Sequence, residues 1–273
     1  MNKFLLAFFI AVGLVSTANA WTQSAPLDPS YCIQTHAPWG APQAQRPDSN
    51  YICRRGYFLQ HDNIAKIPVW VSWMVNPNTV NGCWPRTNAF VADQSLPPNK
   101  RSTPQDYAGS GYDQGHLAND AHQTWDQQTG FESFLMSNMS PQLPGFNRGI
   151  WKLLESATGA WVFSRQTQVI VFAGHVYDPN TSRKIGRNQV VVPDALYKIV
   201  VDTRTGEALA FYFPHQENLG NDLTRFQVTV ADIERVSGIV FPMPPNTNKA
   251  QRYSIWPIDF KSVADAKRAL CRR

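Results

Sequence analysis

Two stretches decide the fold of this chain. The first is GYDQGHL at residues 111–117, and the second is SNMSPQ at residues 137–142 followed by NRGIWKLLE at residues 147–155. In the first stretch His116 directly follows Gly115. A glycine lets the backbone turn sharply, so it can lift the imidazole out of a strand end. The first stretch therefore predicts a histidine presented at the end of a short strand.

The second stretch supplies two asparagines and one glutamate, namely Asn138, Asn147 and Glu155. We expect the last two to lie on a helix. Neutral oxygen ligands and a single carboxylate suit a hard divalent cation, which takes oxygen ligands and keeps several waters. A histidine beside such a cation suits the activation of water. The two stretches together predict a metal-assisted hydrolytic site.

Two of these side chains also have ordinary interpretations. Asn138 precedes Met139 and Ser140, so it lies in an N-glycosylation sequon. Asn147 starts a predicted helix, and asparagine is favoured as a helix cap. Both alternatives remain open from the sequence.

The N-terminus has the pattern of a secretory signal. Lys3 gives the positive start, residues 4–15 form an apolar run, and residues 18–20 are a small-residue cleavage site. The run is shorter than the roughly 20 apolar residues that a membrane span needs. We therefore expect a signal peptide over residues 1–20, an irregular arm over residues 21–56 and a single domain over residues 57–273. The protein would be secreted or periplasmic, with no membrane association after cleavage.

Four cysteines follow the predicted signal: Cys32, Cys53, Cys83 and Cys271. An even count in an exported chain favours disulfides over free thiols. Three pairings are possible, and the sequence does not choose among them. We favour Cys32 with Cys53, which closes a local loop, and Cys83 with Cys271, which ties the C-terminus to the body.

The chain of 273 residues is basic, with a formal net charge of +5, and 43% of its residues are hydrophobic. A basic balance suits a polyanionic partner such as nucleic acid or a membrane surface. The hydrophobic content is that of a globular protein with a sizeable core. The charge is consistent with a nucleic-acid substrate but does not establish one.

Strands and helices are mixed along the chain. We expect strands at residues 69–75, 168–173, 196–201 and 208–213, with a hairpin turn containing Gly206 between the last two. We expect helices at residues 147–157, 231–236 and 263–269. Strands and helices do not alternate regularly, which favours an α+β fold over a doubly wound sheet.

The residues Asp113-Gln114-Gly115-His116 resemble the Asp-Arg-Gly-His signature of the DNA/RNA non-specific endonucleases, the ββα-metal group that includes the Serratia-type nuclease. The stretches at 137–142 and 147–155 are similar to that family's Ser-Asn-x-x-Pro-Gln and Asn-x-Gly-x-Trp-x-x-Leu-Glu. The resemblance runs from about residue 57 to 240. It implies a ββα-metal (His-Me finger) nuclease fold with a central antiparallel sheet flanked by helices.

The resemblance also implies a role for each matching residue. His116 would be the general base, and Asn147 would be the direct protein ligand of Mg²⁺, with Mn²⁺ as an alternative metal. Glu155 would hold metal-bound water, Asn138 would support the site, and Arg86 would hold the phosphate. The implied substrates are DNA and RNA, cut to 5′-phosphate ends.

Two positions depart from the family pattern. Gln114 replaces the arginine of the signature, and we count it among the candidate site residues. Gly159 stands where a second arginine usually follows the glutamate. Lys152, Arg148 or Arg165 are possible substitutes for the missing charge. The departures leave a second interpretation open, a catalytically weak or inactive relative that binds nucleic acid or a protein partner. The sequence does not predict an oligomeric state.

Overall fold

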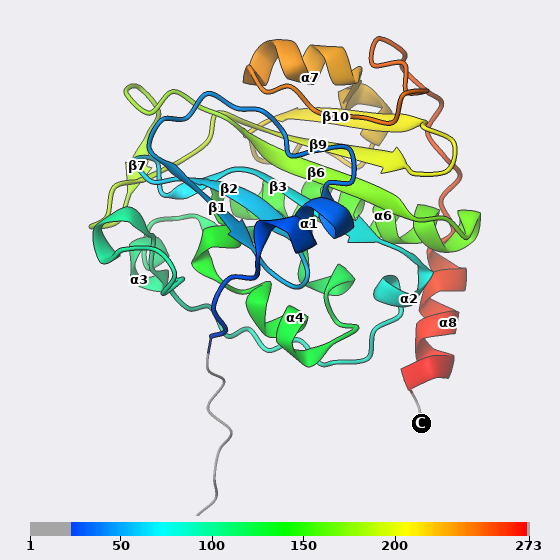
Figure 1. Cartoon of the computed structure of the whole chain (residues 1–273), viewed down its shortest axis with the longest axis horizontal. Helices are drawn as coiled ribbons and strands as arrows, with labels where there is room; N and C mark the ends of the chain where they lie inside the picture. Colours follow the sequence, from blue (N-terminus) through cyan, green and yellow to red (C-terminus); the bar gives the residue numbers. More distant parts are fainter. Residues whose placement is uncertain (1–22, 272–273) are drawn as a thin grey trace, which may run out of the picture.

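A seven-stranded antiparallel sheet forms the centre of the molecule (Figure 1). The computed structural model describes residues 23–271. The strands, in spatial order, are β1 (Ser49–Cys53), β2 (Phe58–Asp62), β3 (Ile67–Val75), β6 (Val169–Val176), β9 (Ala195–Asp202), β10 (Ala208–Pro214) and β11 (Gln227–Val228). The α+β class and the central antiparallel sheet predicted from the sequence are confirmed.

Helices cover both faces of this sheet. On one face, β3 residues Val71, Trp73 and Val75 pack with helix α6 (Lys152–Arg165). On the other face, α1 (Pro29–His36) and α7 (Val230–Ser237) cover a second apolar cluster. Strands that are covered on both faces have continuous apolar runs in their sequence, instead of alternating apolar and polar residues. This is why the strand predictions at 69–75 and 168–173 match β3 and β6.

The predicted hairpin and the helix before Gly238 are also confirmed. Strands β9 and β10 pair antiparallel across the turn that contains Gly206. Helix α7 begins after Thr229, whose side chain forms a capping box with Asp232. The helix ends at Gly238, which has a left-handed backbone (φ 67°) that a glycine adopts at little cost. Local sequence signals therefore set both ends of this helix.

A second, small sheet carries the Asp-Gln-Gly-His stretch at residues 113–116. Strand β4 (Asp113–His116) pairs antiparallel with β5 (Met139–Gln142), so that His116 lies opposite Met139. The chain then runs through α5 (Pro144–Phe146) and a π-helical turn (Asn147–Trp151) into α6. Two strands followed by a helix form the predicted ββα unit.

Helix α6 is longer than predicted. We expected it to end at residue 157, before Gly159, but it continues to Arg165. Ala157, Ala160 and Trp161 are buried against the sheet. Their burial outweighs the cost of about 1 kcal/mol that a glycine imposes inside a helix.

The described part of the expected N-terminal arm is irregular only in part, because it contains one helix and one strand. Asp28 caps α1 by accepting a hydrogen bond from the Ser30 amide, and β1 forms an edge of the main sheet. The arm was predicted as irregular because proline is frequent in it. Pairing with β2 orders residues 49–53 instead. The predicted signal peptide, residues 1–20, lies outside the described residues.

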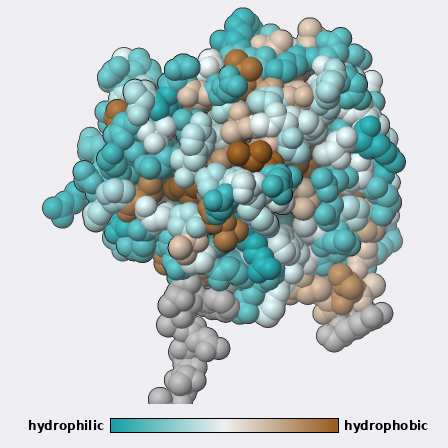
Figure 2. Space-filling model, in the orientation of Figure 1, coloured by the Kyte–Doolittle hydropathy of each residue, from teal (hydrophilic) through white to brown (hydrophobic). Residues whose placement is uncertain are grey.

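The two disulfides are Cys32–Cys53 and Cys83–Cys271, as favoured from the sequence. The second joins the segment after α2 (Pro77–Val80) to the end of α8 (Phe260–Cys271), which is longer than the helix predicted at residues 263–269. Figure 2 shows that the side chains on the face viewed in Figure 1 are mainly hydrophilic, with small apolar patches. Across residues 23–271, no helix is both long and apolar enough to cross a membrane.

Short elements complete the structure. They are the 3-10 turns η1 (Pro98–Lys100), η2 (Asp120–His122), η3 (Met136–Asn138) and η5 (Leu223–Phe226), the helices α3 (Pro104–Tyr107) and α4 (Gln127–Glu132), and the strand pair β7 (Lys184–Ile185) and β8 (Val190–Val191).

Candidate active site

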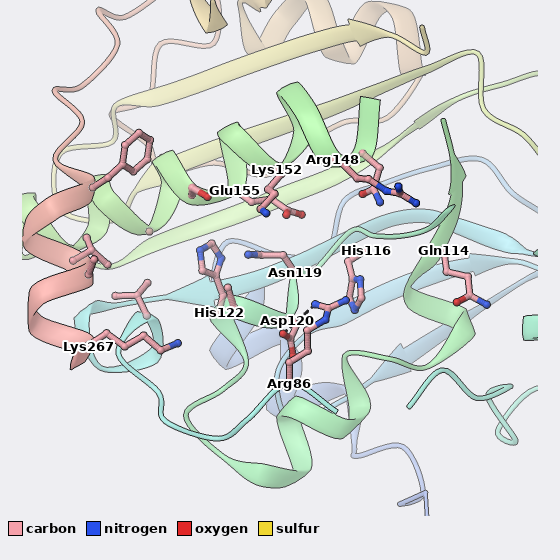
Figure 3. A pocket seen from close by; sticks show the side chains of 18 residues that line it. Arg86, Gln114, His116, Asn119, Asp120, His122, Arg148, Lys152, Glu155 and Lys267 are labelled. Carbon is pink, nitrogen blue, oxygen red and sulfur yellow. Dashed lines mark hydrogen bonds and ion pairs between the residues drawn. The ribbon is translucent and has the colours of Figure 1, made fainter. Parts of the chain in front are cut away.

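A cavity of about 640 Å³ lies where β4, η2, the start of α6 and α8 meet (Figure 3). Five of the six predicted site residues line it: Arg86, Gln114, His116, Asn147 and Glu155. The sixth, Asn138, lies behind the cavity and is fully buried. Residues separated by up to about 70 positions in the sequence thus share one cavity wall.

His116 ends β4 with its ring packed among aromatic side chains. It lies edge-on to Phe134, with ring centroids 4.8 Å apart, and 5.7 Å from Phe90. Among the described residues, its Nε2 atom has no hydrogen-bond partner. Burial, aided by the charge of Arg86, lowers the pKa of His116 to about 3. The imidazole is therefore neutral at pH 7, which is the form that a general base requires.

Asn138 holds the loop that follows His116. Its Oδ1 accepts a hydrogen bond from the Ala118 amide at 3.0 Å, and its Nδ2 donates to the Ala118 and Ser133 carbonyls at 2.9 and 2.8 Å. Trp151 Nε1 also donates to the His116 carbonyl at 3.0 Å. An asparagine buried with these bonds is not accessible as a glycosylation site in the folded protein. The sequon interpretation is therefore excluded, and the contacts of Asn138 are those of a supporting residue.

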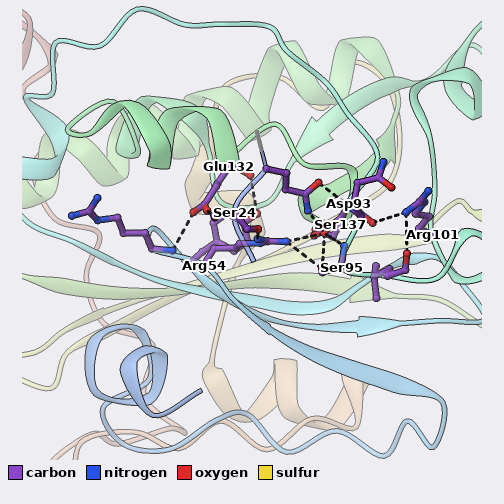
Figure 4. Close-up of polar contacts among 12 residues, drawn as sticks. Ser24, Arg54, Asp93, Ser95, Arg101, Glu132 and Ser137 are labelled. Atoms are coloured by element: carbon purple, nitrogen blue, oxygen red, sulfur yellow. Dashed lines mark hydrogen bonds and ion pairs between the residues drawn. The ribbon is translucent and has the colours of Figure 1, made fainter. Parts of the chain in front are cut away.

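A buried charge network lies next to this loop (Figure 4). Arg54 Nη2 and Asp93 Oδ1 are 2.8 Å apart, and both side chains are fully buried. Asp93 also accepts hydrogen bonds from Ser137 Oγ at 2.6 Å and Ser95 Oγ at 2.5 Å. Buried charges are stable only when they are paired and hydrogen-bonded. The network fixes Ser137, and with it the neighbouring Asn138.

Asn147 does not act as a helix N-cap. Its backbone is helical (φ −59°, ψ −48°), and its Nδ2 donates to Asp113 Oδ2 at 2.9 Å. Because Asp113 holds the amide nitrogen, the amide oxygen is the atom left to bind a cation. Asp113 also accepts two bonds from Arg148, at 2.9 and 2.7 Å. The donor set fits a hard, oxygen-binding cation at Asn147.

Glu155 forms a buried ion pair that the sequence analysis missed. Its Oε1 lies 3.7 Å from Lys198 Nζ, which is too long for a hydrogen bond. Lys198 is 1% exposed and lies over the rings of Trp151 and Trp73. Burial raises the pKa of Glu155 to about 7, and the charges of Lys198 and Arg86 oppose that shift. A lysine inside the apolar strand 195–202 was the signal that could have identified Lys198.

Arg86 faces the cavity next to Asp120, another residue that the sequence analysis did not identify. Its Nη1 lies 3.1 Å from Asp120 Oδ2, and its Nε donates to Asn88 Oδ1 at 2.7 Å. The guanidinium also lies 4.8 Å from the ring centroid of Phe134. With its side chain 49% exposed, Arg86 remains available to an anionic ligand.

The two departures from the family pattern lie on the cavity wall. Gln114 lines it, and so does Gly159. Of the three proposed substitutes, Lys152 and Arg148 line the cavity. Arg165 was a wrong candidate: it pairs with Asp202 and Glu207 at the far end of α6 because ten residues separate it from Glu155.

The other histidines are packing residues, with one exception. His36, His175 and His215 hydrogen-bond to backbone groups, and His61 Nδ1 bonds to Asn63. His122 is different, because it lines the cavity while its Nδ1 accepts a hydrogen bond from Trp73 Nε1 at 3.3 Å.

Comparison with known proteins agrees with this geometry. A family model described as DNA/RNA non-specific endonuclease matches residues 37–248. A nuclease from Nostoc sp. is 33% identical, over 88% of this chain and 92% of its own. The mitochondrial endonuclease G of Homo sapiens is 32% identical, over 69% of this chain and 68% of its own. A crystal structure of the EndoG/EndoGI complex contains a similar chain, with a TM-score of 0.70 and 28% identity, covering 79% of this chain and 92% of that one.

Proposed function

The chain belongs to the DNA/RNA non-specific endonuclease family and is an endonuclease, and on that premise we propose that it is an exported, Mg²⁺-dependent enzyme that cuts DNA and RNA to 5′-phosphate and 3′-hydroxyl ends. One observation carries this proposal: His116, Asn147 and Glu155 face the same cavity. A base, an oxygen ligand and a carboxylate are the groups that hydrolysis of a phosphodiester requires.

His116 is the proposed general base. A phosphodiester is an anion and repels hydroxide, so the attacking water must lose its proton at the moment of attack. The Nε2 atom of a neutral imidazole can accept that proton, and such help is typically worth about 10²–10⁴-fold in rate. The aromatic packing of the ring and the bonds of Asn138 around residue 118 hold the base in one orientation.

Asn147 is the residue that would hold the metal. Its amide oxygen is neutral, so a cation bound there keeps its full charge for the substrate. Bound Mg²⁺ would supply positive charge to the phosphate oxygens as negative charge develops on them. Glu155, when ionised, accepts hydrogen bonds from water on the same side of the cavity. Asp113 orients the Asn147 amide.

Arg86 is the proposed phosphate-binding residue. A guanidinium forms strong, often bidentate hydrogen bonds with phosphate oxygens. The pairing with Asp120 holds the guanidinium at the cavity while leaving it partly exposed. Such donors matter most when they are already oriented before charge develops.

Export is supported by the signal-like pattern at residues 1–20 and by the two disulfides, which persist in oxidising compartments. N-terminal sequencing of protein recovered from the medium or periplasm would test it. We expect a start at Trp21, and an intact Met1 would contradict the proposal.

The activity is tested with supercoiled plasmid and structured RNA, incubated with purified protein in Mg²⁺ or in chelator. We expect cleavage of both substrates only with the metal, and products that ligate without prior phosphorylation. Binding without cleavage would instead support the inactive relative that Gln114 and Gly159 leave open.

A further inference from the structure

Four cationic side chains line the active-site cavity: Arg86, Arg148, Lys152 and Lys267 (Figure 3). Carboxylates already pair with both arginines. Within residues 23–271, neither lysine has a carboxylate partner. The one printed polar contact of Lys267 is long, 3.5 Å from its Nζ to Thr124 Oγ1. Among the described residues, Lys152 and Lys267 are therefore the cavity cations that form no ion pair with a carboxylate.

The charge of Lys267 acts inside the cavity. Burial raises the pKa of Asp120, and the charges of Arg86 and Lys267 both oppose this shift. In Figure 3 the Lys267 side chain extends from α8 toward Asp120 and His122, on the side of the cavity away from Gln114. A phosphate bound between Arg86 and α8 would lie within reach of this ammonium group.

Helix α8, which carries Lys267, lies beyond the end of the family match at residue 248. It forms one wall of the cavity through Phe260, Val263 and Ala264. None of its described residues is buried, so apolar packing holds it only in part. The Cys83–Cys271 disulfide attaches its last turn to the segment that leads to Arg86.

We propose that Lys267 is a substrate-binding residue of this endonuclease, which contacts a backbone phosphate of the nucleic acid and supplies positive charge that Gln114 and Gly159 do not. The Cys83–Cys271 disulfide holds the lysine at the cavity. The proposal deepens the proposed function and rests on it. A lysine is a compact point charge on a flexible stem, which suits contact with phosphate in any sequence.

Phosphate contacts have a signature that structural contacts lack. Each phosphate neutralised on duplex DNA releases counterions. The logarithm of the binding constant therefore falls linearly with the logarithm of the salt concentration, and each phosphate contact adds about 0.9 to the steepness of this salt slope. Loss of one phosphate contact therefore makes the salt slope shallower by roughly one. Loss of a purely structural lysine would change the melting temperature and leave this slope unchanged.

The test measures binding of fluorescent duplex DNA in chelator over a range of salt concentrations. We compare wild type with Lys267→Gln, Lys267→Arg and Lys261→Gln. Lys261 is the matched control, because it lies on the same helix, pairs with Asp265 and does not line the cavity. Thermal melts verify that each variant is folded.

We expect Lys267→Gln to reduce the salt slope by about 0.9 and to raise KM for DNA in Mg²⁺ by about threefold to tenfold. Lys267→Arg should restore both values, and Lys261→Gln should match wild type. A Cys83→Ser/Cys271→Ser variant should show the Lys267→Gln defect although Lys267 is present.

An unchanged slope and KM in folded Lys267→Gln would overturn the inference, as would wild type that does not bind DNA in chelator. Failure of the proposed function gives a different result, wild type that binds DNA but does not cut it in Mg²⁺. A Cys83→Ser/Cys271→Ser variant that behaves like wild type would reject the role of the disulfide.

Discussion

The ammonium of Lys198 lies 3.7 Å from the carboxylate of Glu155, in buried space next to the active-site cavity. Neither atom has a hydrogen-bond partner in the described part of the chain. Desolvation raises the pKa of Glu155 to about 7, and Lys198 is the largest influence that opposes it. Burial therefore raises the pH at which Glu155 becomes ionised, and Lys198 limits that rise.

Removing the Lys198 charge should shift the pH dependence of cleavage. The ionised form of Glu155 exists above its pKa and is lost as pH falls through about 7. In Lys198→Met the opposing charge is absent, so the pKa of Glu155 should rise further. We expect the acid limb of the kcat/KM profile to move to higher pH. The Glu155→Gln variant should cleave slowly at every pH, and its kcat/KM profile should lack the acid limb. A Lys198→Met profile that overlays wild type would show that Glu155 does not control the limb.

His116→Ala should lower cleavage by about 10²–10⁴-fold, because it removes the general base. The fold should persist, since Asn138 holds the adjoining loop through backbone groups of Ala118. Initial rates on plasmid, together with a circular dichroism spectrum, measure both effects. A folded variant that cleaves DNA at a near-normal rate would contradict the assignment of the base.

Asn147→Ala should increase the Mg²⁺ concentration needed for half-maximal cleavage and lower the maximal rate. The substitution removes the amide oxygen that we propose as the metal ligand. Asn147→Asp supplies a carboxylate oxygen at the same position, so it should bind the metal more readily than the alanine variant. Metal titrations of the cleavage rate compare the three proteins. Identical titration curves for wild type and Asn147→Ala would place the metal elsewhere.

Gln114→Arg should raise kcat/KM on DNA roughly tenfold. A hydrogen bond to a charged group is worth about 1.5–3 kcal/mol, against roughly 1 kcal/mol for a neutral one, so a guanidinium here should add about 1–2 kcal/mol. Gln114 lines the cavity. The control is Gln251→Arg, which adds the same charge at an exposed position away from the cavity. No gain over that control, on DNA or RNA, would reject a charge deficit at position 114.

Stability should fall as pH decreases from about 7 to 5. Burial lowers the pKa of all six histidines, to about 3 for His116 and His122 and to about 4 for His36 and His175. The unfolded chain titrates near 6.5, so below that pH the unfolded state binds more protons than the folded state and is favoured.

Glu155 acts in the opposite direction, because its folded pKa is raised, but it contributes only one proton. Ordinary carboxylates are largely ionised throughout this window. Melting temperatures at several pH values between 5 and 7.5 measure the trend. A constant melting temperature over that range would show that the histidines are not held neutral by the fold.

Much of the fold followed from local sequence patterns. Apolar runs predicted β3 and β6, the glycine turn predicted the β9–β10 hairpin, and Gly238 predicted the end of α7. Such signals act over a few residues, so they are readable without the tertiary structure. The end of α6 and the order in residues 29–53 were not predicted, because burial and strand pairing between distant segments decide them.

The sequence by itself determined the principal chemistry of the site, since His116, Asn147 and Glu155 lie in two motifs whose spacing is set by one ββα unit. Only the tertiary structure decided which other charges reach that unit. Lys198 meets Glu155 because β9 packs against α6, and Lys267 reaches the cavity because α8, whose last turn carries a disulfide to Cys83 that spans 188 residues, lies against α6. It also excluded Arg165, which the rise of the helix carries away from the cavity. Charges contributed by separate elements are brought together by packing and covalent closure, and no local pattern in the chain encodes that proximity.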